Sequence, residues 1–266
     1  MVIDTGHVIS SLKENVLTLT LNRPRKRNAL SEGMYRRLRA ELMAADDAPE
    51  IRVILITGAP EVFSSGADLK ELMGREDKDP ATLPSIAFLK AIGRVKKPLV
   101  AAVEGMAIGI GATMLLHCDF VFASARTLFR FPFVNLGLCV EGGASLLLPG
   151  IAGYHRAAGL LLTGDDFYGD TAHGIGLVHR LCEEGEVAER ARALAERLAR
   201  KSPEALVATK ALLKRGAHGE VTETILAEAE RFRERLFSPD AREALTAFFE
   251  GRAPDFSAVG AAAAGT

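Results

Sequence analysis

The sequence predicts an α/β protein, and two kinds of observation support this. Three apolar runs rich in branched residues, at 52–57, 99–103 and 120–122, predict strands that are buried on both faces. Glycine-containing turns follow two of these runs, and helical patterns lie between them. A repeat of strand, turn and helix is typical of crossover connections in an α/β fold. With 266 residues, 48% of them hydrophobic, the chain is long enough to bury a large core.

The N-terminal elements are predicted from alternation and capping. Residues 8–13 and 16–21 alternate in the manner of strands, and the short gap between them predicts a hairpin. Pro24 ends the second strand, because proline cannot continue a ladder. A helix capped by Ser31 is expected to run to about Ala45. Its apolar face repeats at Met34, Leu38 and Leu42.

The C-terminal part is predicted to be entirely helical. Ser202-Pro203 and Ser238-Pro239 each have the pattern of an N-cap followed by proline at the first helical position. Between them, apolar residues at helical spacing predict an amphipathic helix. We therefore expect a core with the binding site at 1–200 and a helical region at 201–256 that packs on the core or on another subunit. Residues 257–266 are expected to form a flexible tail.

Composition excludes several classes of protein. The net charge of -1, the 6% aromatic content and the lack of tryptophan argue against a nucleic-acid partner. No signal peptide is recognisable, and no apolar run reaches the roughly 18 residues that span a bilayer, so no membrane association is expected. Cys118, Cys139 and Cys182 follow no metal spacing and indicate a reduced, cytoplasmic protein.

Common cofactor and nucleophile motifs are also missing from the sequence. There is no P-loop, no G-x-S-x-G and no H-E-x-x-H. The pair Gly109 and Gly111 fails as a dinucleotide fingerprint, because Met114 occupies its third position. The adjacent His117, Cys118 and Asp119 are better interpreted as a packed helix-to-strand junction than as a metal site, so no metal is expected.

Two glycine-containing turns remain as candidate binding elements, at 63–69 and at 104–111. Each follows a predicted buried strand and precedes a helical pattern, so each can direct free backbone N–H groups at a ligand oxygen. Either turn alone is better explained by tight packing. Together, they can supply two donors to one carbonyl oxygen, which is the arrangement of an oxyanion hole.

These turns are part of a wider resemblance. The segments VFSSGADLKEL, VEGMAIGIGATMLLHCDFVFAS, LFRFPFVNLGLCVEGG and TAHGIGLVHRL follow one another as in the enoyl-CoA hydratase/isomerase (crotonase) superfamily, and RPRKRNAL and FFEGRAPDF also resemble it. The resemblance covers about residues 8–256. It implies a crotonase-type spiral of β-β-α units with an all-helical C-terminal trimerisation region. It further implies homotrimers, often paired into hexamers, and acyl-CoA thioester substrates, with coenzyme A as part of the substrate and no separate cofactor.

The resemblance assigns roles to individual residues. The thioester oxygen would be held by the N–H groups of Ala67 and Ile110. The two glutamates that hydratases of the family use correspond to Thr113 and Phe133, which cannot act as carboxylates. Glu141 lies where peroxisomal-type Δ3,Δ2-enoyl-CoA isomerases have their single catalytic glutamate. On local sequence alone, a first-turn helix glutamate is the competing interpretation of Glu141.

Further residues are candidates for binding the coenzyme A thioester. Four cations occur within 23–27, and Arg27 or a neighbour is the expected phosphate contact. Surface charge in a loop is the alternative explanation. Asp68 and Glu71 are better explained as charges at a helix start. The remaining candidates along the two turns and the preceding loop are Ala29, Ser65, Gly66, Asp68, Leu69 and Gly109.

The sequence therefore predicts an isomerase that moves a 3-enoyl-CoA double bond to the 2-position, with Glu141 as the base. A non-enzymatic acyl-CoA binder, or another reaction of the superfamily such as hydration, ring chemistry or thioester cleavage, are the alternatives. Residues 74–84 contain two prolines and many charges, and they are expected to border the acyl pocket.

Overall fold

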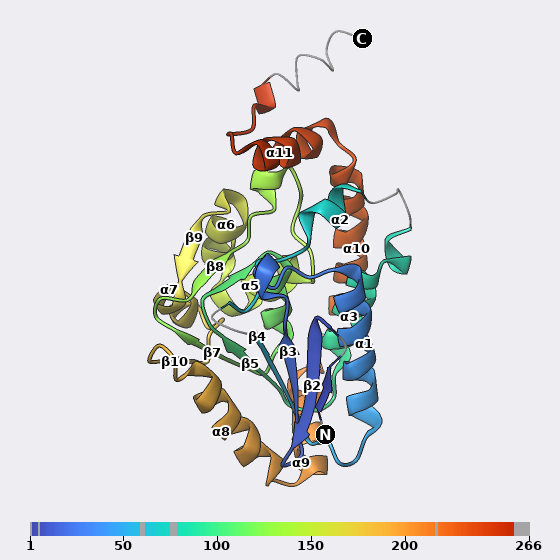
Figure 1. Ribbon diagram of the computed structural model, residues 1–266, viewed down its shortest axis with the longest axis vertical. Helices are drawn as coiled ribbons and strands as arrows, with labels where there is room; N and C mark the ends of the chain where they lie inside the picture. The colour runs from blue at the N-terminus through green and yellow to red at the C-terminus, as the bar shows by residue number, and fades with distance from the viewer. Residues whose placement is uncertain (1, 5, 59–61, 75–78, 216–217, 258–266) are drawn as a thin grey trace.

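A mixed β-sheet forms the centre of the molecule (Figure 1). The computed structural model describes residues 2–4, 6–58, 62–74, 79–215 and 218–257. Within this part of the chain, seven strands lie in the order β1-β2-β3-β4-β5-β7-β10. Their bounds are β1 Val2–Asp4, β2 Val8–Lys13, β3 Val16–Leu21, β4 Val53–Gly58, β5 Leu99–Val103, β7 Phe120–Ser124 and β10 Arg180–Cys182.

The strand directions confirm the α/β class. β2 and β3 form the expected hairpin, with Val8 opposite Leu21 and Lys13 opposite Val16. From β3 onward through β4, β5, β7 and β10 every neighbouring pair is parallel. Parallel strands must be joined by crossover connections, and helices supply most of them.

The two faces of the sheet belong to two different layers of the core. In β4, Ile54 and Ile56 pack in the main cluster with helices α1 and α3, whereas Val53 and Leu55 pack against α8. This division follows from the two-residue period of a strand. Figure 1 shows α8 on one side of the sheet and α1 and α3 on the other. These three helices are α1 Glu32–Asp47, α3 Pro84–Arg94 and α8 Val187–Ala199.

A second, smaller sheet lies beside the turn at 63–69, where Ser64 forms an isolated parallel bridge with Ala107. Its strands are short, in the order β6-β8-β9, with β6 and β8 parallel and β9 antiparallel to β8. Three residues are too few to show a hydrophobic period, so sequence patterns did not predict this sheet. Its strands are β6 Met106–Ile108, β8 Leu128–Arg130 and β9 Asp166–Tyr168.

The predicted helix caps are confirmed. The hydroxyl oxygens of Ser31, Ser202 and Ser238 accept hydrogen bonds from backbone N–H groups at the starts of α1, α9 and α11. The remaining helices are α2 Leu69–Met73, α4 Ile110–Thr113, α5 Ala144–Ala152, α6 Tyr154–Thr163, α7 Gly169–Gly174, α9 Pro203–Leu213, α10 His218–Leu236 and α11 Pro239–Glu250. Single 3-10 turns occur at Pro24–Lys26, Pro80–Thr82, Met114–His117 and Val134–Leu136.

The C-terminal helices α10 and α11 join the main core. Val221, Ile225 and Ala229 of α10, together with Ala241 of α11, are buried in the same cluster as the sheet. Among the described residues, no helix combines the length and the apolarity needed to cross a membrane. The predicted tail at 257–266 lies outside the described residues except for Ser257.

Candidate active site

A cavity of about 550 Å³ lies between the two glycine-containing turns, the loop that carries Glu141, and helices α10 and α11. Its wall is largely apolar, as is usual for a site that binds a small molecule. The apolar residues that line it include Ile108, Ile110, Phe133, Leu136 and Leu138. Leu83, from the predicted pocket border, also lines the cavity, whereas residues 75–78 of that border lie outside the described residues.

The first turn is held by backbone pairing with the chain before α1. Leu30 N–H donates to the Gly66 carbonyl at 2.7 Å, and Asp68 N–H donates to the Leu30 carbonyl at 3.0 Å. Ala67 lies between these two bonds and forms an isolated parallel bridge with Leu30. In such a pairing the backbone groups of Ala67 itself face away from Leu30. Ala67 lines the cavity.

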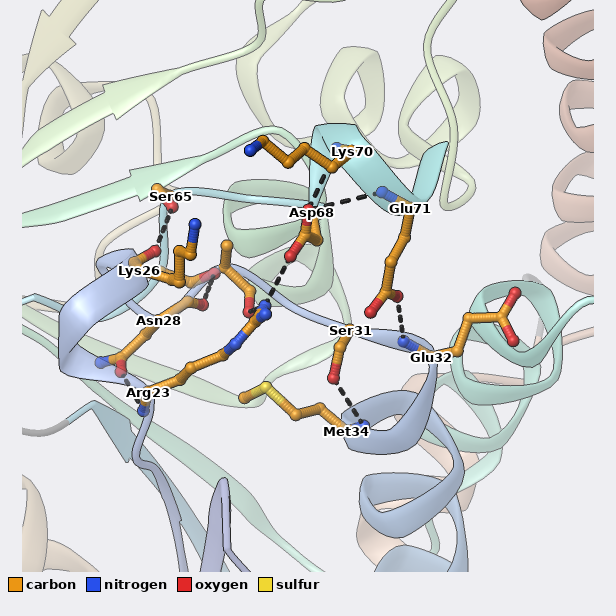
Figure 2. Close-up of polar contacts among 12 residues, drawn as sticks. Arg23, Lys26, Asn28, Ser31, Glu32, Met34, Ser65, Asp68, Lys70 and Glu71 are labelled. Atoms are coloured by element: carbon orange, nitrogen blue, oxygen red, sulfur yellow. Dashed lines mark hydrogen bonds and ion pairs between the residues drawn. The ribbon is translucent and has the colours of Figure 1, made fainter. Parts of the chain in front are cut away.

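A network of side chains supports this turn (Figure 2). Arg23 Nη1 donates to Asp68 Oδ2 at 2.8 Å and to the Ala29 carbonyl at 3.1 Å. The Asp68 Oδ1 atom accepts from the N–H groups of Lys70 and Glu71, which caps α2. Burial raises the pKa of Asp68, but the bonds from Arg23, Lys70 and Glu71 outweigh it and hold the pKa below its usual value.

The second turn runs alongside the first. Ser64 N–H donates to the Met106 carbonyl at 3.0 Å, and Ile108 N–H donates to the Ser64 carbonyl at 3.0 Å. Gly109 has φ +55 and is the N-cap of α4, so Ile110 is the first helical residue. N–H groups in a first helical turn have no partner inside the helix. Within the described residues, the hydrogen bonds of the two turns use amides other than those of Ala67 and Ile110.

The two turns approach closely because Gly66 has no side chain. Gly66 has φ +96, and a Cβ atom at this position would lie 2.8 Å from the Ile108 carbonyl oxygen. Both requirements can be met only by glycine. The structure thus brings Ala67 and Ile110 to the wall of one cavity.

Glu141 lines the same cavity and is 8% exposed. The Thr113 hydroxyl donates to its Oε1 atom at 3.1 Å. Helix α5 begins at Ala144, with Gly143 as N-cap, so Glu141 precedes the helix. Its interpretation as a residue of the first helical turn is therefore wrong.

Glu141 is the only acid on the cavity wall among the residues that the structure describes. Thr113 and Phe133 are the residues that the resemblance assigns to the two hydratase glutamates; Thr113 is fully buried beside Glu141, and Phe133 lines the cavity. Neither side chain can take up or give a proton as a carboxylate does. Among the described residues of the wall, Glu141 is therefore the side chain with the chemistry of a carboxylate acid or base.

The other predicted binding residues divide into two groups. Arg27, Ser65, Gly66, Leu69 and Gly109 line the cavity. Ala29 and Asp68 do not line the cavity. Both accept hydrogen bonds from the Arg23 side chain, and in this way they support the first turn. Asp68 is also the N-cap of α2, so its interpretation as a helix-start charge is confirmed.

Sequence reasoning missed several polar residues of the cavity wall. Tyr35 and Ser85 come from elements without a recognised motif, Arg233 comes from α10, and Arg130 lies within the quoted segment LFRFPFVNLGLCVEGG. Arg252 also lines the cavity, and it lies within the quoted segment FFEGRAPDF, which was the available signal. Arg130, Arg233 and Arg252 each pair with a carboxylate, at Asp166, Glu230 and Glu243 respectively. Across the described residues, Arg27 makes no such pair.

The residues His117 to Asp119 form a packed junction between the 3-10 turn after α4 and β7. His117 is buried, and its Nε2 atom lies 2.7 Å from the Gly142 carbonyl oxygen. Burial lowers its pKa to about 4, so the ring is neutral near pH 7 and donates this hydrogen bond. Where the structure describes the chain, no three metal-ligating side chains gather.

The chain resembles known proteins along most of its length. The family described as enoyl-CoA hydratase/isomerase matches residues 11–259. The chain belongs to this family. The structure of Pseudomonas aeruginosa OdaA superposes with a TM-score of 0.89 at 40% identity, covering 92% of this chain and 99% of that one. The protein is therefore an enzyme of the enoyl-CoA hydratase/isomerase family with the crotonase fold.

Two relatives from Escherichia coli (strain K12) show the range of reactions in this family. A 2,3-dehydroadipyl-CoA hydratase is 35% identical over 257 residues, covering 94% of this chain and 98% of the relative. A 1,2-epoxyphenylacetyl-CoA isomerase is 32% identical over 264 residues, with the same two coverages of 94% and 98%. Acyl-CoA thioester substrates are expected for this family.

Proposed function

We propose that the protein is an acyl-CoA isomerase that moves a 3-enoyl-CoA double bond to the 2-position. Glu141 takes a proton from C2 of the substrate and returns it at C4. The position of Glu141 as the only acid on the described cavity wall carries this proposal. One carboxylate is enough for a proton shift between two carbons, because the same group is base and then acid.

The acidity of the substrate is the main chemical difficulty. A carboxylate with a reference pKa of about 4.3 is a weak base toward a C–H bond. We assign the N–H groups of Ala67 and Ile110 to the thioester oxygen, where they stabilise the enolate. Loss of one such donor typically costs about 2.7–4 kcal/mol, so two contribute roughly 5–8 kcal/mol. This lowers the effective pKa of the C–H bond by about 4–6 units.

The apolar wall assists the same step. Phe133, Leu136 and Leu138 line the cavity together with the base, and their apolar side chains disfavour water beside it. Exclusion of water strengthens the attraction between the enolate oxygen and the two N–H groups. It also removes the nucleophile that hydration would need, which favours isomerisation over addition of water.

Hydration is the second candidate, because the 35% identical relative is named a hydratase. In this chain Thr113 and Phe133 occupy the positions where hydratases of the family are expected to carry glutamates. The other relative is named an isomerase, and its printed substrate is an epoxide. The order of preference is therefore isomerisation of an enoyl thioester, then hydration.

We further propose that Arg27 contacts a phosphate of coenzyme A. It lines the cavity and is exposed, and guanidinium groups bind phosphate through paired N–H donors. Coenzyme A is part of the substrate, so the proposed reaction uses no separate cofactor. We also propose that the protein is cytoplasmic and forms a homotrimer or a hexamer.

A panel of 3-enoyl-CoA and 2-enoyl-CoA substrates of graded chain length tests the reaction. We expect 3-enoyl-CoA to yield the conjugated thioester, whose absorbance measures its formation. No oxygen from heavy-oxygen water should be incorporated into this product. If heavy oxygen from water instead entered the product as fast as the product formed, the reaction would be hydration. Chain lengths that react would define the acyl group.

A further inference from the structure

A buried carboxylate on helix α10 holds the turn that follows Glu141. Glu228 is 7% exposed, and its Oε2 atom accepts from Gly143 N–H at 2.6 Å. Its Oε1 atom accepts from Ser145 N–H at 2.8 Å and from Ser145 Oγ at 2.6 Å. The N-cap of α5 is Gly143, which has no side chain of its own to satisfy these groups. Glu228 therefore caps α5 from another part of the chain.

This arrangement is costly for a role in stability alone. Burial raises the pKa of Glu228, and the hydrogen bonds from Ser145 and Gly143 oppose that rise. All three of these donors are neutral. A buried carboxylate loses its hydration, and the hydrogen bonds that it accepts have to offset that cost. Its clear effect is to fix the position of the backbone that it binds.

The backbone that Glu228 fixes carries the proposed base. Glu141 is two residues before Gly143, and both glycines between Glu141 and α5 have positive φ, +81 at Gly142 and +77 at Gly143. Such a segment has little conformational preference of its own. His117 holds the Gly142 carbonyl from the other side. The Glu141 segment is thus held between the turn after α4 and helix α10.

Helix α10 also reaches the substrate cavity. Ala229, Phe232, Arg233 and Leu236 of this helix line it. Glu228 precedes the first of these residues directly. One rigid helix therefore contacts the space where the acyl-CoA binds and also the backbone on which the base is mounted.

We propose that Glu228 is a positioning residue for Glu141, which sets the distance between the base and the substrate carbon. The inference rests on the proposed function, because it takes Glu141 as the base. Displacement of a reacting group by about 1 Å can lower turnover about 100-fold without any loss of binding. Loss of Glu228 is therefore expected to lower kcat and to leave substrate affinity nearly unchanged.

Three variants test the proposal in the full-length protein. Glu228→Ala removes the three hydrogen bonds, whereas Glu228→Gln keeps the volume and one amide oxygen as acceptor. Glu223→Ala is the matched control, because Glu223 is exposed on the same helix. For each variant, kcat and KM are measured with a 3-enoyl-CoA, and Kd with the saturated acyl-CoA of the same length.

We expect Glu228→Ala to lower kcat about 30- to 100-fold, with Kd within about threefold of wild type. Glu228→Gln should recover part of the loss, and Glu223→Ala should match wild type. If Glu228→Ala does not fold, a kcat about 3- to 10-fold lower in Glu228→Gln at unchanged Kd supports the proposal. A wild-type kcat in the folded Glu228→Ala variant, or in Glu228→Gln where only that variant folds, overturns it. So does a fall in kcat that is matched by an equal loss of binding.

Glu141→Ala, measured in the same series, separates this proposal from the proposed function. Isomerase activity retained in Glu141→Ala means that Glu141 is not the base, and both proposals then fail. Activity lost in Glu141→Ala but retained in Glu228→Ala contradicts the positioning role alone. Activity lost in Glu141→Ala, with a lower kcat at unchanged Kd in Glu228→Ala, supports both.

Discussion

The Thr113 hydroxyl donates a hydrogen bond of 3.1 Å to Oε1 of Glu141. Thr113 ends helix α4, which begins with Ile110, so one short element contacts the proposed base and supplies one of the proposed N–H donors. A hydroxyl donor favours the charged form of a carboxylate and restricts its rotation. The residue that stands where a hydratase of the family would carry a glutamate therefore orients the only acid on the described wall.

Replacement of Thr113 tests this relationship. Thr113→Val removes the hydrogen bond that orients the Glu141 carboxylate, so misplacement of the base is expected to lower kcat about tenfold to hundredfold. Thr113→Ser retains the hydroxyl and should retain most of the activity. The measurement is kcat with a 3-enoyl-CoA. Equal activity of the valine and serine variants would show that the hydroxyl has no part in catalysis.

The pair Arg23 and Asp68 supports the first turn (Figure 2), and neither residue lines the cavity. Their side chains are 18% and 13% exposed, so solvent screens the pair only in part. In a double-mutant cycle of Arg23→Ala and Asp68→Ala, measured by urea unfolding, we expect a coupling of about 1–2 kcal/mol. Arg25→Ala, at an exposed position of the same loop, is the control. A coupling indistinguishable from zero would contradict this role.

Gly66 is required for two reasons that can be separated. Gly66→Ala places a Cβ 2.8 Å from the Ile108 carbonyl and also adds a side chain at φ +96. Gly6 has a similar φ of +93 but nothing within 4 Å of its Cβ position. The strained backbone alone costs about 1–3 kcal/mol. We therefore expect Gly6→Ala to lower stability only, and Gly66→Ala to lower kcat more than tenfold as well. Equal activity of the two variants would show that the turns need not approach so closely.

His117 makes stability depend on pH. Burial lowers its pKa to about 4 from 6.5, so the folded state keeps it neutral while the unfolded chain takes up a proton below about pH 6.5. Its contribution is complete above that pH and falls as the pH decreases toward 4. The expected loss between pH 7 and pH 5 is about 2 kcal/mol.

Urea unfolding at the two pH values measures this loss. His117→Gln keeps a donor for the Gly142 carbonyl but does not titrate, so the fall in its free energy of unfolding should be about 2 kcal/mol smaller. If the free energy of unfolding fell equally in wild type and in the variant between the two pH values, His117 would not be the source of the pH dependence.

Sequence patterns predicted the elements with strong local signals. The buried strands β4, β5 and β7 and the helices capped by Ser31, Ser202 and Ser238 were all expected, because branched apolar runs and caps are local properties. The strands β6, β8 and β9 were missed, since pairing between distant segments creates them. The same holds for the Glu228 cap, which joins residues 85 positions apart and has no local pattern.

The two turns of the candidate site were predicted from their positions after buried strands, whereas the roles of individual residues were predicted through the resemblance. Ala67, Ile110 and Glu141 are separated by long stretches of chain, and only the parallel pairing of the two turns and the position of α5 bring them to one cavity. Local patterns could not distinguish Glu141 from a helix-start glutamate. In the structure, Gly142 and Gly143 separate Glu141 from α5, which begins at Ala144.

Turnover of a 3-enoyl-CoA by Glu141→Gln tests the central claim most directly. Glutamine keeps the size of the side chain and can still accept a hydrogen bond from Thr113, but it cannot take up the C2 proton. We predict that Kd for acyl-CoA stays within about threefold of wild type and that kcat falls at least about 1000-fold, within the range expected for a general base. A kcat equal to wild type would contradict the assignment of Glu141 as the base.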